Sequence, residues 1–336
     1  MNNMKITITD VAEEAGVSEA TVSRVINRKA VVKDSTVERV MAAIDKIGYF
    51  PQKAARNLAS NKTYTIGVIL PEIGNEFAAQ ILHGIEAQSS KSEYSLLVAS
   101  RDNEKMDRPL DLALGPHNTD GLVALSGCIS KKEMKLFTDR EFPFVLLYDK
   151  SPRGFPIPSI QIENRKGTKN LIDHLIEVHG YKNFAFLRGP ENSIDSKQRE
   201  EGLRESLNEH GLSLDEELIG MGDFTEEVST AVVKKWLESD KAIDVIFGGS
   251  DEGAIGALMA LKEQGIAVPD EIAVVGFDDM NHVKYLSPPL TTVKSPIEKV
   301  GALGVETLIH ILNGEKVERQ KILPTHLVIR QSCGCH

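Results

Sequence analysis

The stretch TITDVAEEAGVSEATVSRVIN, residues 7–27, decides how the head of this chain folds. Its first half predicts a short helix that Thr9 caps and Gly16 ends. A second helix is expected to begin at once, with Ser18 as its N-cap, because apolar residues recur behind it at i, i+3 and i+4. Two short helices separated by only a few residues must cross at a steep angle, which is helix-turn-helix geometry.

The polar face of the second helix carries side chains that suit a DNA groove. Arg24 can pair with guanine O6 and N7, Glu19 can accept from cytosine N4, and Ala20 can touch a thymine methyl group. Neighbouring hydroxyl and amide groups suit phosphate oxygens. The predicted DNA contacts of the head are Thr9, Ser18, Glu19, Ala20, Thr21, Ser23, Arg24 and Asn27.

A third helix is predicted from the capping-box pattern Ser35-Thr36-Val37-Glu38, and Gly48 should end it. Its expected apolar face comprises Val37, Val40, Met41, Ile44 and Ile47. The alternative to DNA binding is a plain three-helix bundle with solvated charges. The tight turn and the arginine on the polar face favour DNA binding.

Charge is unevenly distributed along the chain. The whole sequence has 39 Lys/Arg against 49 Asp/Glu, a net charge of −10. Residues 1–64 hold ten basic and seven acidic residues, which leaves 29 against 42, or −13, for the remainder. Phosphate would be attracted to the head and repelled by the body, so nucleic acid should meet the head.

Composition points to a globular protein of a reducing compartment. A hydrophobic content of 41% supports real cores, and neither a signal peptide nor a run long enough to span a membrane is apparent. Three cysteines are too few for a disulfide framework, so we expect a cytoplasmic location. The terminal Cys333-Gly-Cys335-His336 has soft-metal ligands, but a frayed tail is the expectation, with no metal and no cofactor.

The linker after the head starts with Pro51, which breaks the chain. Residues 53–60 then show a brief helical pattern that is too short to hold as a helix alone in water. This segment needs a partner.

Head and linker together resemble the lactose/galactose-repressor (LacI/GalR) family of bacterial transcription regulators. The resemblance lies in Ile8-Thr9-Asp10-Val11-Ala12, Val17-Ser18-x-x-Thr21-Val22-Ser23-Arg24-Val25-Ile26-Asn27, Gly48-Tyr49-x-Pro51 and Ala55-Arg56-x-Leu58. It implies that the linker folds into a hinge helix on DNA, paired with its dimer mate in the minor groove, where Leu58 wedges a base step. The implied hinge contacts are Lys53, Ala55, Arg56 and Leu58. Gln52 departs from the family's usual asparagine.

The body alternates short apolar runs with helical segments, which is typical of parallel sheets covered on both faces. Strands are predicted at residues 66–70, 95–99, 121–125, 144–148, 184–188, 219–222, 245–248 and 272–277. Helices are predicted at residues 77–90, 107–115, 131–140, 167–179, 198–211, 229–238 and 254–264. Two α/β subdomains should result, with crossovers near Ile162, Leu290 and Ile322.

This body resembles the periplasmic-binding-protein-like core of the same family, in phrases such as Arg199-x-x-Gly202, Ser250-Asp251-x-x-Ala254 and Val275-Gly276-Phe277-Asp278-Asp279. The expected fold is an all-α helix-turn-helix headpiece followed by an α/β core of two parallel-sheet subdomains. We expect the headpiece over residues 1–50, the hinge and linker over 51–63 and the core over 64–336. The core divides into about 64–162 plus 291–322 and about 163–290 plus 323–336.

Ligands of open α/β sheets bind at the carboxyl ends of strands, so an effector cleft is expected between the subdomains. The resemblance implies sugar or related contacts for Asp149, Arg199 and Asp278. The predicted effector set is Asn75, Phe77, Asp149, Arg199, Ser250 and Asp278, and the alternative for each charged member is a surface salt bridge. Two departures from the family are Ser250 for a frequent asparagine and Glu76 for a frequent proline.

The sequence predicts a homodimeric, ligand-controlled DNA-binding regulator, with repression favoured, that binds a pseudopalindromic operator. The favoured effector is a non-phosphorylated sugar. An acidic effector would use Arg101, Lys150 and Arg153, which are otherwise expected to be solvated loop charges. No catalytic motif is apparent. The rival interpretations are a transport-type solute-binding protein and a sugar-modifying α/β enzyme; no membrane contact is expected.

Overall fold

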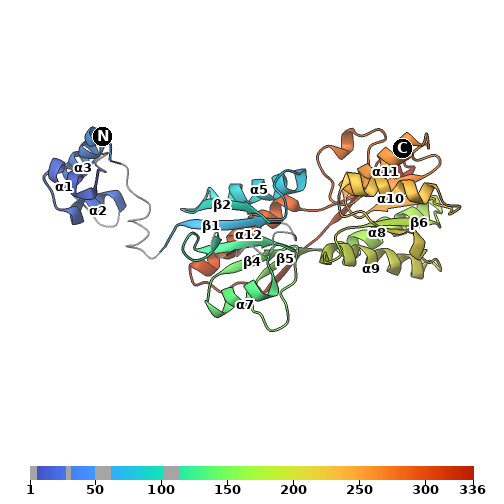
Figure 1. Ribbon diagram of the computed structural model, residues 1–336, viewed down its shortest axis with the longest axis horizontal. Coiled ribbons are helices and arrows are strands. Elements are labelled where there is room, and N and C mark those ends of the chain that lie inside the picture. Colours follow the sequence, from blue (N-terminus) through green and yellow to red (C-terminus); the bar gives the residue numbers. More distant parts are fainter. Residues whose placement is uncertain (1–5, 28–31, 50–61, 102–109, 111–113) are drawn as a thin grey trace. The chain divides into compact units, whose positions relative to one another are not determined.

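The computed structural model describes residues 6–27, 32–49, 62–101, 110 and 114–336. It divides into two compact units, Met1–Thr63 and Tyr64–His336, shown in Figure 1. The hinge residues Lys53, Ala55, Arg56 and Leu58 lie outside the described residues, and so does most of the helix predicted at 107–115.

The first unit is a small helical domain built from α1 (Ile8–Ala15), α2 (Glu19–Asn27) and α3 (Asp34–Ile47). Its core is formed by buried apolar side chains: Val11, Ala12, Ala15, Val22, Val25, Val40, Ala43 and Tyr49. The predicted stops are confirmed, because Gly16 and Gly48 both adopt left-handed backbone, with φ of 64° and 66°. Ser18 caps α2 as predicted, since its Oγ accepts from the Thr21 N–H at 3.3 Å.

Three local predictions in the head are wrong. Thr9 does not cap α1; the helix begins at Ile8, and the backbone N–H and hydroxyl of Thr7 both donate to the Asp10 carboxylate, at 2.6 and 2.8 Å. The Ser35 capping box is absent, because α3 already begins at Asp34. Met41 is 47% exposed rather than buried. Both α1 and α3 therefore begin earlier than the sequence pattern suggested.

The second unit begins with a parallel six-stranded sheet in the order β11-β5-β4-β3-β1-β2. Its strands are β1 (Thr65–Leu70), β2 (Ser95–Ser100), β3 (Gly121–Leu125), β4 (Phe144–Leu147), β5 (Ser159–Ile162) and β11 (Gln320–Leu323). Helices α5 (Glu76–Ser89), α7 (Lys131–Asp139) and α12 (Ile297–Leu312) belong to the same half. β1, β3 and β4 are almost wholly buried, which explains their continuous apolar sequence.

A second parallel sheet follows, in the order β7-β6-β8-β9. Its strands are β6 (Phe184–Arg188), β7 (Ile219–Met221), β8 (Val245–Gly248) and β9 (Ala273–Val275). Figure 1 shows α8 (Asn164–His179) and α9 (Ile194–Glu209) on one side of this sheet, and α10 (Glu226–Leu237) and α11 (Asp251–Glu263) on the other. The predicted fold class, helical headpiece plus a core of two parallel-sheet halves, is confirmed.

Several short elements were not indicated by the sequence pattern. β10 (Thr292–Lys294) and β12 (His326–Val328) pair antiparallel, and the described part of the chain also contains three one-turn helices. These are η2 (Glu216–Leu218), η3 (Val283–Tyr285) and η4 (Gln331–Cys333). β11 and β5 pair in parallel, Ile322 with Gln161, although 161 positions separate these residues in the chain. The predicted limits of the two subdomains stay a prediction.

Helices of the second half begin about one turn earlier than predicted. α9, α10 and α11 start behind Ser193, Thr225 and Ser250, each of which accepts a backbone N–H as an N-cap. The first turns are polar, so the apolar periodicity became visible only one turn later. The capping residues were the signal that could have placed these starts correctly.

Two glycines allow α5 and α12 to pack closely in the first half. A Cβ atom at Gly84 would lie 1.9 Å from the Glu298 carbonyl oxygen, and one at Gly301 would lie 2.4 Å from that of Ile81. Only hydrogen atoms fit at these positions. The two helices therefore approach backbone to backbone, although they come from opposite ends of the core.

Gly84→Ala is expected to lower the free energy of unfolding by at least about 1–3 kcal/mol, because the added methyl group meets backbone that cannot move aside. Gly253→Ala in α11 is the matched control. Its Cβ would lie no closer than 3.4 Å to any neighbour, so stability should stay equal or rise by up to about 1 kcal/mol. Urea unfolding of both variants checks the prediction, and equal stability of Gly84→Ala and wild type would contradict it.

Candidate functional site

A buried guanidinium, that of Arg199 on α9, is the centre of a polar cluster in the core. Its side chain is only 3% exposed. Nε donates to Asn164 Oδ1 at 2.9 Å, Nη1 donates to the Gly249 carbonyl, and Nη2 donates to Asp278 Oδ1 at 3.3 Å. The guanidinium also lies 3.7 Å above the ring of Phe277. The predicted pairing of Arg199 and Asp278 in one site is thus present.

The local fold explains why these groups meet. Asn164 starts α8, Gly249 follows β8, and Asp278 follows β9, so several strand and helix ends converge on one point. Asp278 and Asp279 both have positive φ, 123° and 58°, which is unfavourable for residues with a side chain. Such backbone persists only where its surroundings hold it in place. Asp279 is held by Arg330, whose Nη2 donates to its carboxylate at 2.6 Å.

Carboxyl groups surround the guanidinium, and burial raises their pKa values. Burial raises the pKa of Asp278 well above its ordinary value, against the opposing effect of Arg199. Burial likewise raises the pKa of Asp195 to about 6, although Arg199 and an Asn164 hydrogen bond oppose the shift. Asn164 Nδ2 donates to Asp195 Oδ1 at 2.6 Å. The side-chain oxygen of Asn164 accepts from Arg199, and its side-chain nitrogen donates to Asp195. Asn164 therefore links the guanidinium to a second carboxyl group.

The first half of the core contributes Tyr148 and Asp149 to the same region. Burial is the main cause of the raised pKa of Asp195, and the Asp149 carboxylate adds to it, so the two carboxyl groups interact. Burial also raises the pKa of Asp149 itself. Tyr148 lies in left-handed backbone, φ 55°, and its ring packs 5.2 Å from that of Phe77. An aromatic pair thus accompanies the carboxyl groups.

Asn75 and Ser250 have structural roles. Asn75 caps α5 by accepting the Ala78 N–H at 2.8 Å, and Ser250 caps α11 by accepting the Gly253 N–H at 3.1 Å. Helix capping explains both residue types without an effector. Their effector contacts, and those of Phe77, Asp149, Arg199 and Asp278, stay predictions.

Sequence reasoning missed Asp195, Asn164 and Tyr148. Asp195 lies four residues before Arg199, which places both on one face of α9. That relation was hidden because the helix was predicted to begin at Gln198. Recognition of Ser193 as its N-cap would have revealed it.

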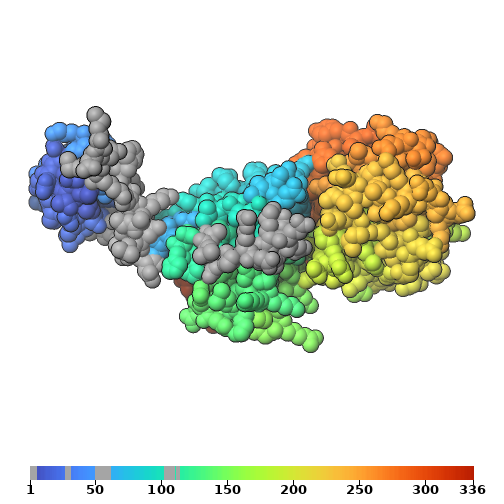
Figure 2. Space-filling model, viewed as in Figure 1, coloured from blue at the N-terminus to red at the C-terminus, as the bar shows by residue number. Residues whose placement is uncertain are grey.

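Glu76 connects the two halves of the core. Its carboxylate accepts the Asn281 N–H at 2.6 Å and contacts the His282 ring, while Gln80 donates to it at 3.0 Å. Figure 2 shows the surfaces of the two halves meeting at this end of α5. Burial favours a higher pKa for Glu76, but these hydrogen bonds outweigh it and hold the pKa below its ordinary value. The departure from proline at this position thus supplies a contact between the halves.

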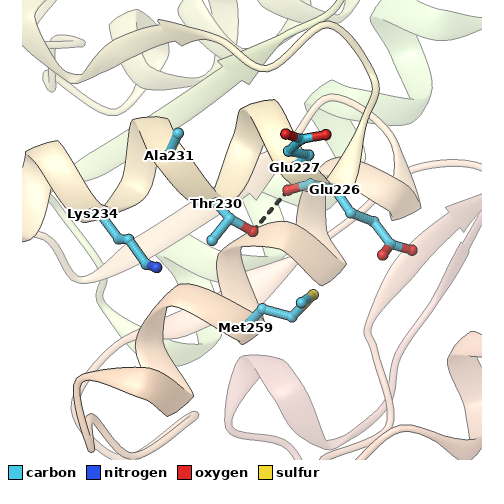
Figure 3. Close-up of a pocket in the computed structure, with 6 residues that line it drawn as sticks. All are labelled: Glu226, Glu227, Thr230, Ala231, Lys234 and Met259. Atoms are coloured by element: carbon cyan, nitrogen blue, oxygen red, sulfur yellow. Dashed lines mark hydrogen bonds between the residues drawn. The ribbon is translucent and has the colours of Figure 1, made fainter.

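A shallow hollow of about 460 Å³ lies between α10 and α11 (Figure 3). It is lined by Glu226, Glu227, Thr230, Ala231, Lys234 and Met259. The Thr230 hydroxyl is already bonded to backbone carbonyls, at 2.7 and 3.0 Å, and the charged side chains point in different directions. Converging polar groups are what fixes a small ligand, so the Arg199 cluster is the stronger candidate.

The predicted DNA-reading side chains lie on the outer surface of α2. Glu19, Ala20 and Arg24 are exposed. The Thr9 hydroxyl donates to Glu19 Oε1 at 2.7 Å, so it already has a partner within the head and joins α1 to α2. Ser18 Oγ lies 3.0 Å from Thr21 Oγ1. Ser23 lies half-buried on α2, and the side chain of Asn27 lies outside the described part. The DNA contacts of this set stay predictions.

Comparison with known proteins supplies the family. Residues 7–52 match the model described as bacterial regulatory proteins, lacI family, and residues 172–333 match the periplasmic binding protein-like domain. The chain is 35% identical over 334 residues to catabolite control protein A of Priestia megaterium, covering 98% of this chain and 99% of that protein. The chain belongs to the lacI family.

Solved structures of transcription regulators share the fold. The lac repressor dimer bound to operator and the anti-inducer ONPF superposes with a TM-score of 0.86 at 27% identity, covering 98% of this chain and 99% of that one. The complex of the transcriptional regulator CelR with cellobiose gives 0.73 at 30% identity, covering 97% and 99%. The family consists of DNA-binding transcription regulators rather than enzymes. None of the helices in the described part of the chain combines the length and the apolar composition that a membrane span requires.

Arg199→Ala is expected to destabilise this lacI-family core by about 3–5 kcal/mol, because Asn164, the Gly249 carbonyl and Asp278 all lose a buried partner. Arg165→Ala is the matched control: its guanidinium pairs with Glu205 at 2.6 Å on the surface, where an ion pair adds little. Urea unfolding should therefore separate the two variants clearly. Similar stability of both would show that the Arg199 cluster does not hold the core together.

Proposed function

We propose that this protein is a homodimeric transcriptional repressor whose operator affinity is controlled by a neutral, polyhydroxylated effector. The effector site is the Arg199 cluster with Asp149, Asp195 and Asp278. The observation that carries the proposal is the convergence of a buried guanidinium and several carboxyl groups on one point at the strand ends. The operator and cellobiose complexes of the two structural relatives support both halves of this proposal.

Charge favours a neutral effector over a phosphorylated one. Arg199 already faces Asp278 and interacts with Asp195, and Asp149 adds a further carboxyl group. A phosphate would meet three carboxyl groups and one guanidinium there, and its negative charge would disfavour ionisation of those carboxyl groups. Arg101, predicted as a possible solvated or effector-facing charge, is buried and bonded to Glu133 at 2.9 Å, so it has a structural role.

Hydrogen-bonding chemistry fits a sugar. Each hydroxyl group both donates and accepts, so it can bridge a carboxylate and a guanidinium. The Phe77 and Tyr148 rings offer an apolar surface of the kind that small-ligand sites use beside their polar groups.

Control would run through the relative orientation of the two halves. Glu76 joins α5 to residues 281 and 282, and the Tyr148 hydroxyl lies 3.5 Å from that of Ser295, which directly follows β10. An effector acts only if it binds one orientation more tightly than the other. Such a shift would change the spacing of the two linkers in the dimer, and with it the fit of paired headpieces to a two-fold operator.

Selection of binding sites from random duplex DNA tests the DNA half of the proposal. We expect a pseudopalindrome, and Arg24→Ala should relax the preference at one base pair per half-site by about 1–3 kcal/mol. Arg39→Ala, an exposed arginine on α3, should keep the wild-type profile as the control. An unchanged profile for Arg24→Ala would remove it from base recognition.

The pH dependence of effector binding tests the effector part of the proposal. Asp195, with a pKa of about 6, accepts hydroxyl hydrogen bonds best when ionised, so affinity should be full above pH 6 and fall as pH drops through it. The fall approaches about tenfold per pH unit for one proton. Calorimetry would use the sugar that most raises the melting temperature in a thermal-shift screen.

Asp195→Asn should bind this sugar more weakly at pH 7 and lose one proton from the pH dependence. Asp139→Asn, at an exposed ion pair with Lys135, should keep the wild-type profile. A pH profile that is identical in Asp195→Asn and wild type would exclude Asp195 from the effector site.

A further inference from the structure

Four metal-ligand side chains meet at the C-terminal end of α8. His174 and His179 come from this helix, and Cys333 and Cys335 come from the last four residues of the chain. One ligand atom of each lies within 4.8 Å of the others. Cys335 Sγ is 3.3 Å from His179 Nε2 and 3.6 Å from His174 Nε2. Two thiols and two imidazoles therefore face a common point.

The fold of the tail places these thiols. Ser332 and Cys333 are fully buried, and the Ser332 hydroxyl accepts the Thr291 N–H at 2.8 Å. Gly334 then turns the chain with φ 100°, and a Cβ there would lie 3.3 Å from the His179 ring. The prediction of a frayed tail is thus wrong for the residues up to Cys335. The nearby imidazoles also come from α8, whereas the sequence suggested the adjacent His336.

We propose that His174, His179, Cys333 and Cys335 bind one Zn²⁺ ion in a tetrahedral Cys₂His₂ site. Zn–S bonds of about 2.3 Å and Zn–N bonds of about 2.0–2.1 Å separate the ligand atoms of a tetrahedron by roughly 3.3–3.8 Å. The distances of 3.3 and 3.6 Å from Cys335 Sγ to the two imidazole nitrogens already lie in this range. A structural zinc site has four protein ligands of this kind, and this cluster supplies that number.

Neighbouring groups suit a bound thiolate and neutral imidazoles. The Thr291 hydroxyl donates to Cys333 Sγ at 3.1 Å, and Tyr181 donates to the Cys333 carbonyl at 3.1 Å while its ring stacks on His179. Such outer contacts orient metal ligands. Binding would release two thiol protons to solvent as the two Zn–S bonds form.

The cluster is independent of the proposed effector and DNA sites, so its test does not depend on them. The full-length protein, reduced and freed of metal, is titrated with Co²⁺ and then Zn²⁺. We expect one ion per chain, thiolate-to-cobalt charge-transfer absorption with the bands of a tetrahedral ion, displacement by Zn²⁺ and a Tm raised by several degrees.

Variants assign the ligands. Cys335→Ser and His179→Gln should each weaken binding by more than about 100-fold, since loss of even an outer contact costs about 10–100-fold. Cys128→Ala and His326→Gln remove a thiol and an imidazole elsewhere and should bind like wild type. Cys335 is partly exposed at the tail, so Cys335→Ser is expected to fold, which circular dichroism without metal verifies.

Three results would overturn the proposal. One is the absence of Co²⁺ and Zn²⁺ binding by the fully reduced wild-type protein. Another is equal binding by Cys335→Ser. The third is equal binding by His179→Gln.

Discussion

The burial of one positive charge organises the core. A guanidinium removed from water is costly unless its donors are satisfied, and Arg199 meets this requirement with Asn164, Gly249 and Asp278. These partners begin α8, follow β8 and follow β9, so the ends of separate elements are held to one point. The unusual backbone at Asp278 is understandable as part of the same constraint.

Local patterns made much of the fold predictable. Glycine stops, a serine cap and buried strands such as β3 were evident because each depends on residues close in sequence. The strands β10 and β12 and the helix α12 were not predicted, since their partners lie far along the chain. α12 packs on α5 through Gly84 and Gly301, and nothing near either glycine in the sequence reveals the other.

The candidate sites divide in the same way. Arg199 and Asp278 were reached through a family resemblance, whereas Asp195 was lost when its helix was started too late. Cys335 lies 156 positions after His179 and 161 positions after His174, so no local motif could indicate these two histidines as its neighbours. Tertiary structure was needed to distinguish an ordered tail from a frayed one.

The six-stranded sheet has a consequence for synthesis on the ribosome. Its edge strand β11 and its covering helix α12 follow the entire four-stranded sheet in the chain. At about 5–20 residues per second, β5 therefore waits on the order of 10 s for its partner β11 to be made. The six-stranded sheet therefore begins first but gains β11 only after the four-stranded sheet has been made, and its β5 edge stays open to other strands during that interval.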